Sequence, residues 1–160
     1  MIHIRLSWPE ISLAGNVGVL RKVYAMQRQL ISKDGANQGD WNSEIDGACG
    51  EMAVAKWLGM YWTGTIGETD KPDVGPYEVR TNGSRKYTDT ILRPGKVHKD
   101  RAYISVLAFL PDFEIIGWIM GADATQQQWF RNGTPDRPKA WFVPQTSLQP
   151  LHTLPIEEAA

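Results

Sequence analysis

The stretch from Trp41 to Gly59 reads WNSEIDGACGEMAVAKWLG, and it contains the most informative residue of the chain, Glu51. The apolar residues of this stretch recur at helical spacing: Ile45, Ala48, Cys49, Met52, Ala53, Val54, Trp57 and Leu58. On such a helix, the residues one turn away from Glu51 carry no charge. Because an isolated buried carboxylate is costly, we expect Glu51 to be ion-paired, protonated or bound to a cation.

A second group of charged residues follows in the segment from Lys71 to Arg80, which reads KPDVGPYEVR. It adds two carboxylates, Asp73 and Glu78, and a cation, Arg80. On a strand, Glu78 and Arg80 share the face opposite to Val79. Three acidic side chains that meet at one place would suggest a divalent metal site.

Length and composition predict one domain spanning residues 1–160, with residues 144–160 as a C-terminal tail packed on it. The chain is 42% hydrophobic and 22% charged, as is usual for a soluble globular protein. Its single cysteine excludes an internal disulfide and fits a reducing compartment. We see neither an apolar run long enough to span a bilayer nor a signal peptide, so we expect a cytoplasmic protein without a membrane partner.

Hydrophobic periodicity and turn residues predict the order of the elements. We expect helices over residues 15–33 and 41–59 and a short helix over 122–130. Strands are expected over residues 2–6, 73–74, 77–81, 87–93, 102–110, 114–120 and 140–143. This order predicts an α+β fold, with a mixed α/β sheet flanked by helices.

Positive charge is concentrated between Arg80 and Arg101. This segment holds seven cations and two acidic residues, a net charge of +5, while the whole chain carries −1. A basic segment next to an acidic cluster is what a metal-dependent enzyme acting on a polyanion needs, although a solvated hairpin is the simpler explanation. The candidate phosphate contacts are Arg85, Lys86, Arg93, Lys96, Lys99 and Arg101.

The acidic residues resemble the active-site pattern of the PD-(D/E)XK nuclease superfamily, which has the restriction-endonuclease-like fold. Pro72-Asp73 looks like the PD element, and Glu78-Val79-Arg80 looks like the (D/E)XK element with Arg in the Lys position. Gly50-Glu51 resembles the upstream helical glutamate of the family. The resemblance is clear over residues 41–110. The wider arrangement, including Gly117-Trp118-Ile119, is similar to small phage proteins.

The resemblance implies a site for Mg²⁺ or Mn²⁺. It assigns Asp73 and Glu78 as direct ligands, with the carbonyl of Val79 assisting and Glu51 acting directly or through water. Mg²⁺ prefers few carboxylates together with water and phosphate oxygens. Such an ion would activate water and neutralise charge on the phosphoryl group.

Arg80 departs from the family pattern, because arginine stays protonated and cannot act as a base. We consider three interpretations. Arg80 replaces the lysine while the metal generates hydroxide, or Lys86 or Lys56 reaches the site from elsewhere. Alternatively, the site has lost catalysis and keeps DNA or metal binding.

Each acidic residue also has a structural explanation without metal. Asp73 is a common type of turn residue after proline. Glu78 could face solvent on its strand, paired with Arg80 or Lys71. Glu51 could form a buried ion pair with Arg80.

The resemblance therefore implies a nuclease that hydrolyses DNA phosphodiester bonds, with Glu51, Asp73, Glu78 and Arg80 as catalytic residues. A short chain of this kind could act as a homodimer to grip both strands. The first alternative is a catalytically inactive module of the same fold that binds DNA or a protein. The second is an interaction protein that engages a host or phage protein.

Overall fold

The computed structural model describes residues 1–28, 41–68, 70–83, 88–133 and 138–155. The elements in chain order are β1 (Ile2–Arg5), α1 (Trp8–Gln27), α2 (Asn42–Leu58), β2 (Glu78–Asn82), β3 (Thr90–Leu92), β4 (Ala102–Phe109), β5 (Asp112–Met120), α3 (Gly121–Ala124), η1 (Gln127–Trp129), β6 (Phe130–Arg131), β7 (Ala140–Val143), η2 (Gln145–Ser147) and η3 (Leu151–Thr153).

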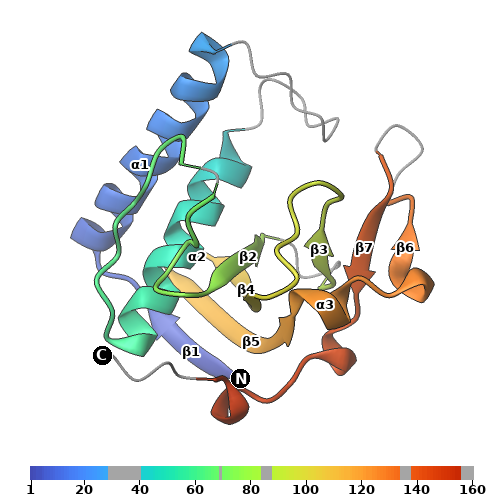
Figure 1. The fold of residues 1–160 in the computed structure, drawn as a ribbon. Coiled ribbons are helices and arrows are strands. Elements are labelled where there is room, and N and C mark those ends of the chain that lie inside the picture. Colours follow the sequence, from blue (N-terminus) through green and yellow to red (C-terminus); the bar gives the residue numbers. More distant parts are fainter. Residues whose placement is uncertain (29–40, 69, 84–87, 134–137, 156–160) are drawn as a thin grey trace.

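The main sheet has the strand order β1-β5-β4-β2. Strand β2 runs parallel to β4, whereas the β4–β5 and β5–β1 pairs are antiparallel. Helices α1 and α2 lie side by side at one end of the molecule, and a smaller sheet of order β3-β7-β6 lies at the other (Figure 1). The prediction of an α+β protein with a mixed sheet and flanking helices is therefore confirmed.

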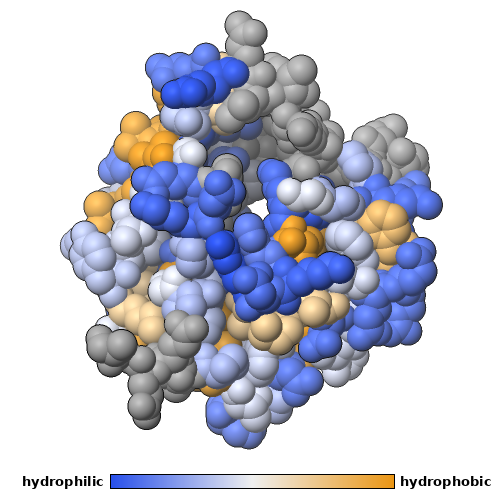
Figure 2. All heavy atoms as spheres, viewed as in Figure 1, coloured by the Kyte–Doolittle hydropathy of each residue, from blue (hydrophilic) through white to orange (hydrophobic). Residues whose placement is uncertain are grey.

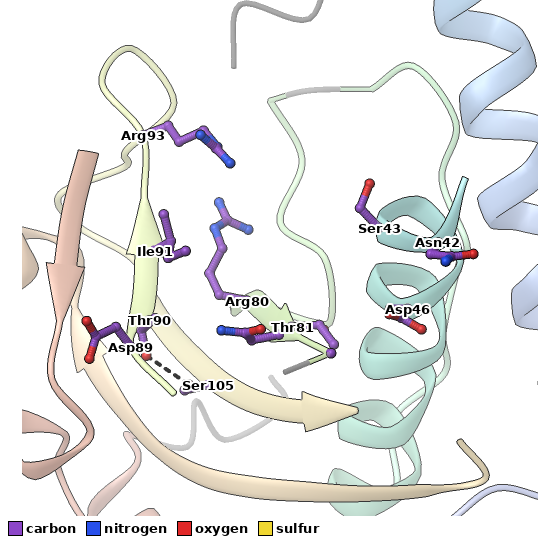
Figure 3. A pocket seen from close by; sticks show the side chains of 12 residues that line it. Asn42, Ser43, Asp46, Arg80, Thr81, Asp89, Thr90, Ile91, Arg93 and Ser105 are labelled. Atoms are coloured by element: carbon purple, nitrogen blue, oxygen red, sulfur yellow. Dashed lines mark hydrogen bonds between the residues drawn. The ribbon is translucent and has the colours of Figure 1, made fainter. Parts of the chain in front are cut away.

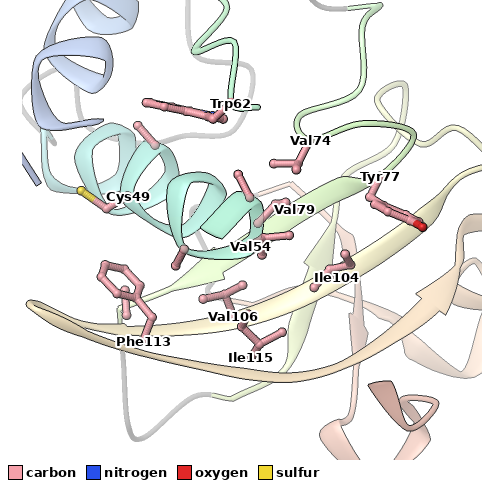
Figure 4. Close-up of a cluster of buried hydrophobic side chains, with 14 of the residues drawn as sticks. Cys49, Val54, Trp62, Val74, Tyr77, Val79, Ile104, Val106, Phe113 and Ile115 are labelled. Atoms are coloured by element: carbon pink, nitrogen blue, oxygen red, sulfur yellow. The ribbon is translucent and has the colours of Figure 1, made fainter. Parts of the chain in front are cut away.

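Strand β4 is buried on both faces, which explains why its sequence is almost continuously apolar. Ile104 and Val106 belong to the core cluster shared with α2 (Figure 4). Tyr103 packs instead in a second cluster with residues of β3, β5 and β7. Next to it, the buried hydroxyls of Thr90 and Ser105 are joined by a hydrogen bond of 2.8 Å. The strand thus joins two layers of the protein.

Helix α1 begins at Trp8, earlier than the predicted start at residue 15. Proline in the first turn costs no helical hydrogen bond, so Pro9 is compatible with the helix rather than a break. The carboxylate of Glu10 accepts a hydrogen bond of 2.6 Å from the backbone N–H of Ser7. The helix ends at Gln27, and part of the predicted C-terminal turn lies outside the described residues.

Helix α2 matches the predicted stretch closely, ending where Gly59 adopts a left-handed conformation. The short helix predicted over residues 122–130 is instead divided into α3 and η1. Within the described part of the chain, no helix is both long enough and apolar enough to cross a membrane.

The C-terminal segment lies against the main sheet. Trp118 of β5 exchanges backbone hydrogen bonds with Gln149. The hydroxyl of Tyr77 donates a hydrogen bond of 2.6 Å to the carbonyl of Pro155. Leu151 and Leu154 are buried in the main core cluster. The segment therefore contacts both β5 and the residue that precedes β2.

Helices α1 and α2 approach each other closely at Gly18. A Cβ atom at this position would lie 2.7 Å from the carbonyl oxygen of Glu44. The contact is with backbone, which cannot rotate away as a side chain can. The helix pair therefore requires glycine at position 18.

We expect Gly18→Ala to lower the free energy of unfolding by about 1–3 kcal/mol, because the helices must separate to admit the methyl group. Gly15→Ala on the same helix is the matched control, since a Cβ there meets no atom within 4 Å. That control should be neutral or stabilising by up to about 1 kcal/mol. Urea denaturation of both variants measures the difference, and equal effects would contradict the proposed close contact.

Candidate functional site

Three carboxylates that are distant in sequence come together beside β2. Glu51 lies on α2 and Glu78 begins β2, and each residue is only 5% exposed. Asp73 precedes the turn that leads into β2, where Val74 and Tyr77 form a backbone bridge. Burial raises the pKa of Asp73, and the charges of Glu51 and Glu78 add to this rise, as expected for three neighbouring carboxylates. We call Glu51, Asp73 and Glu78 the carboxylate cluster.

The guanidinium of Arg80 contacts the three groups that the resemblance assigns as direct or assisting metal ligands: the carboxylates of Asp73 and Glu78 and the carbonyl of Val79. Nη1 of Arg80 lies 3.3 Å from Oδ2 of Asp73 and donates a 2.7 Å hydrogen bond to the carbonyl of Val79. Nη2 lies 3.2 Å from Oε2 of Glu78. The guanidinium also lies over the ring of Tyr103, with its carbon 4.9 Å from the ring centroid. One positive group therefore holds all three oxygen donors.

Glu51 is held by a different arginine, Arg21 of α1. Nη1 and Nη2 of Arg21 donate to its two carboxylate oxygens at 2.6 and 2.8 Å. The indole N–H of Trp62 donates a third hydrogen bond at 3.0 Å. Glu51 therefore forms a buried ion pair, as one alternative predicted, but the partner is Arg21 and the predicted partner Arg80 is wrong. The available signal was the position of Arg21, one turn after the buried Gly18 on the inner face of α1.

Glu78 is bound by two arginines rather than facing solvent. Nη1 of Arg101 donates a 2.7 Å hydrogen bond to Oε1, while Arg80 contacts the other oxygen. Nη2 of Arg101 donates to the carbonyl of Asp70 at 2.6 Å. The alternative of a solvent-facing Glu78 is therefore wrong, whereas its pairing with Arg80 is confirmed. Arg101 is a further partner of this carboxylate.

The other predicted cations have different locations. Lys96 and Lys99 are exposed between β3 and β4, and Arg93 is half-buried. Arg85 and Lys86 lie outside the described residues.

Lys56 does not supply the lysine that the family pattern would place at the cluster. Its ammonium group donates to the carbonyl of Arg5 at 3.0 Å and to the carboxylate of Glu10 at 2.9 Å. The alternative in which Lys56 reaches the site is therefore wrong, because its donor is directed toward β1 and the start of α1.

Burial and, after it, the charge of Glu51 raise the pKa of Asp73 from 3.8 to about 7. Arg80 and the backbone N–H of Val79 act in the opposite direction, but they do not compensate. The positive charge of Arg80 therefore does not offset the cost of burying the Asp73 carboxylate.

The donors around Arg80 are of the kind that Mg²⁺ and Mn²⁺ bind, namely two carboxylates and a backbone carbonyl. Within the described residues, however, no three His, Cys, Asp or Glu side chains form a group ready to hold a metal ion. Glu51 is directed to Arg21 and Trp62, which leaves Asp73, Glu78 and the Val79 carbonyl as the convergent set.

A polar pocket of about 520 Å³ is lined in part by Arg80, which also contacts Asp73 and Glu78 of the carboxylate cluster. It lies between the first turns of α2, strand β2 and strand β3 (Figure 3). This face of the molecule is largely hydrophilic and is hollowed near its middle (Figure 2). The lining residues are Asn42, Ser43, Asp46, Arg80, Thr81, Asn82, Gly83, Asp89, Thr90, Ile91, Arg93 and Ser105.

Close packing of β2 against α2 depends on Gly50, the neighbour of Glu51. A Cβ at Gly50 would collide with the hydroxyl of Thr81. Among the described side chains, this hydroxyl is also the buried polar atom that has no hydrogen-bond partner. Gly50 thus lets the strand that carries Glu78 and Arg80 approach the helix that carries Glu51.

Comparisons with protein-family models, with curated proteins and with solved structures found no match for this chain. The structure establishes a mixed α+β fold, and the nuclease interpretation continues to rest on the motif residues and their geometry.

We expect Arg21→Met to lower the free energy of unfolding by about 3–5 kcal/mol, because it leaves the carboxylate of Glu51 buried without a counter-ion. Arg5→Met is the control: its 3.5 Å pair with Asp112 is exposed on both sides and should contribute less than about 1 kcal/mol. Adding Glu51→Gln to Arg21→Met should restore part of the loss. Chemical denaturation checks the series, and similar losses for both single variants would contradict it.

The raised pKa of Asp73 predicts a pH-dependent stability. Between the ordinary value of 3.8 and about 7, the folded chain binds a proton that the unfolded chain does not. This contribution to the free energy of unfolding therefore falls as pH rises through that window. Asp73→Asn should be more stable than wild type above pH 7, with the difference shrinking toward pH 4.

Denaturation curves across this range measure the effect, with exposed Asp112→Asn as the control that should keep the wild-type slope. A constant difference between Asp73→Asn and wild type at every pH would overturn the assignment.

Proposed function

We propose that the protein is a metal-dependent nuclease that hydrolyses DNA phosphodiester bonds. The observation that supports this best is the convergence of Asp73, Glu78 and the Val79 carbonyl on one positively charged group. A pocket lined by two arginines adjoins that point. Oxygen donors for a divalent cation and positive charge for a phosphate are thus neighbours.

In this proposal Asp73, Glu78 and the Val79 carbonyl hold Mg²⁺ or Mn²⁺, and Glu51 assists directly or through water. The bound ion would supply an activated water and neutralise charge on the phosphoryl oxygens. The high pKa of Asp73 supports this assignment, because a second positive charge would stabilise its ionised form.

The arginines have distinct roles in the proposed reaction. Arg80 is permanently charged, so it stabilises negative charge on the phosphoryl oxygens and does not accept a proton. Arg101 fixes one oxygen of Glu78 through a 2.7 Å hydrogen bond. Arg21 fixes both oxygens of Glu51 as a positioning residue. Each carboxylate is therefore oriented before substrate arrives.

A second candidate function is a catalytically inactive module that binds DNA or a protein partner, including a host or phage protein. The specific observation in its favour is that the guanidinium of Arg80 already contacts all three oxygen donors. A built-in cation of this kind could replace the metal permanently. In the nuclease, a metal ion would displace the guanidinium of Arg80 from these oxygens. In the inactive module, the guanidinium would stay there.

Cleavage of DNA by purified protein with Mg²⁺ or Mn²⁺ tests the proposal. We expect wild type to cut and Glu78→Gln to lose activity by about 100-fold or more, since loss of a direct ligand should exceed the cost of an outer-shell change. Asp112→Asn is the control, because that carboxylate is exposed at the start of β5 and remote from the pocket. Circular dichroism and thermal unfolding establish that each variant folds.

If wild type binds DNA but cuts neither single-stranded nor duplex substrates with either metal, the enzyme proposal fails and the inactive module stands. If Glu78→Gln cuts as well as wild type, the proposed site is wrong even though the protein is a nuclease.

A further inference from the structure

We propose that the outer face of α1 is the contact surface of a symmetric homodimer, in which the α1 helices of two copies pack antiparallel about a two-fold axis. This face lies on the side of α1 away from α2 and the carboxylate cluster. The dimer therefore does not depend on the proposed nuclease activity.

The outer face of α1 is apolar and uncharged. Throughout this helix, which the structure describes in full, no exposed residue carries a charge, although 22% of the chain is charged. The charged residues of the helix, Glu10, Arg21 and Lys22, lie on its other sides. Figure 2 shows apolar side chains over the edge of the molecule that α1 forms. The exposed residues are Trp8, Pro9, Ser12, Leu13, Asn16, Val19, Leu20, Met26 and Gln27.

The exposed apolar area is large enough for a dimer. Trp8 is 82% exposed, Leu13 58%, Leu20 51% and Met26 56%. At about 200 Å² for each large side chain, these four residues leave roughly 500 Å² in contact with water. Two copies therefore offer about 1,000 Å², which is the lower limit for a specific interface, so we expect a reversible dimer.

The order of these residues along α1 is self-complementary. Leu13 and Leu20 lie at equal distances from the midpoint between residues 16 and 17, on one flank of the face. Trp8 and Met26 lie almost equally far from this midpoint, on the other flank. A two-fold axis at the midpoint places Leu13 against Leu20 of the second copy. The same axis places Trp8 against Met26 of the second copy, a favourable contact between an aromatic ring and a thioether. A two-fold interface requires such matching, because both copies present the same patch.

Asn16 lies near the proposed axis, between the two flanks. One N–H of its amide donates to the carbonyl of Ser12 at 2.9 Å. An amide group has a second donor and an acceptor, so the Asn16 side chains of two copies can hydrogen-bond across the axis. A single asparagine among apolar helix contacts fixes the register and the number of helices. Its central position therefore favours one antiparallel register of two helices.

The inner side of α1 is fixed, so the outer face is ordered before a second copy arrives. Arg21 is bound to Glu51 of α2 by two hydrogen bonds, and Gly18 allows α1 to approach α2 closely. A surface that is already ordered loses little conformational entropy on association. The contacts that join α1 to α2 thus also favour the dimer.

Sedimentation equilibrium of the full chain measures the association. We expect a concentration-dependent monomer–dimer equilibrium for wild type. Leu20→Glu should weaken it by at least about tenfold, because each dimer would bury two unpaired carboxylates. Gln127→Glu is the matched change of charge and should associate as wild type does. Its residue is exposed on η1, which lies beside the smaller sheet at the other end of the molecule (Figure 1).

Two double variants test the antiparallel order. In Leu13→Lys/Leu20→Glu, each introduced lysine faces an introduced glutamate of the second copy. This variant should associate at least about tenfold more tightly than Leu20→Glu, because the buried carboxylates regain partners. In Leu13→Lys/Leu20→Lys, like charges face each other and the chain should stay monomeric. The two positions are about 10 Å apart along one helix, so they do not pair within a copy.

Circular dichroism and thermal unfolding establish that each variant folds. A wild type that remains monomeric at its highest soluble concentration would overturn the dimer, as would equal association by folded Leu20→Glu. Equal association by the two double variants would overturn the antiparallel order. A monomeric wild type that co-sediments with phosphatidylcholine vesicles would assign the face to a lipid surface instead.

Discussion

The ion pair between Arg21 and Glu51 is the interaction on which the arrangement of the site depends. Both side chains are largely removed from water, so either charge would be strongly destabilising without the other. Arg21 donates two short hydrogen bonds to the carboxylate of Glu51, and Trp62 donates a third. Arg21 also donates to the carbonyl of Thr65 through Nε at 2.9 Å. One guanidinium thus fixes α1, α2 and the segment after α2 relative to one another. The glycine at position 18 allows the helices to approach closely enough for this pair to form.

Arginine side chains balance the negative charge of the carboxylate cluster. Glu51, Asp73 and Glu78 are each contacted by at least one of Arg21, Arg80 and Arg101. The balance is uneven, because Glu78 has two arginines while Asp73 shares Arg80 with it. Burial and the charge of Glu51 raise the pKa of Asp73, and the shared arginine does not offset them. Arg80, the arginine that Asp73 and Glu78 share, also lines the polar pocket.

The local patterns of the sequence predicted the elements more successfully than the partners of the charged residues. Helix α2 and strands β4 and β5 follow from periodicity and apolar runs, since these signals depend on residues close in sequence. The sequence also indicated that Glu51 needs a counter-charge. The position of Arg21, one turn after Gly18, was a signal, but it did not identify the partner, because that contact depends on how α1 packs against α2. Arg101 was predicted as a phosphate contact, and its hydrogen bond to Glu78 was not foreseen for the same reason.

The hydrogen bond from Trp62 to Glu51 gives the protein an internal optical reporter. The indole is nearly buried and its N–H donates directly to the carboxylate. Its emission should therefore respond to any change in the local field, whether from protonation, an arriving ion or a shift of α1. The difference between the emission of wild type and of a Trp62→Phe variant would isolate this signal from the other tryptophans. Events at the site could then be followed in real time without attaching a dye.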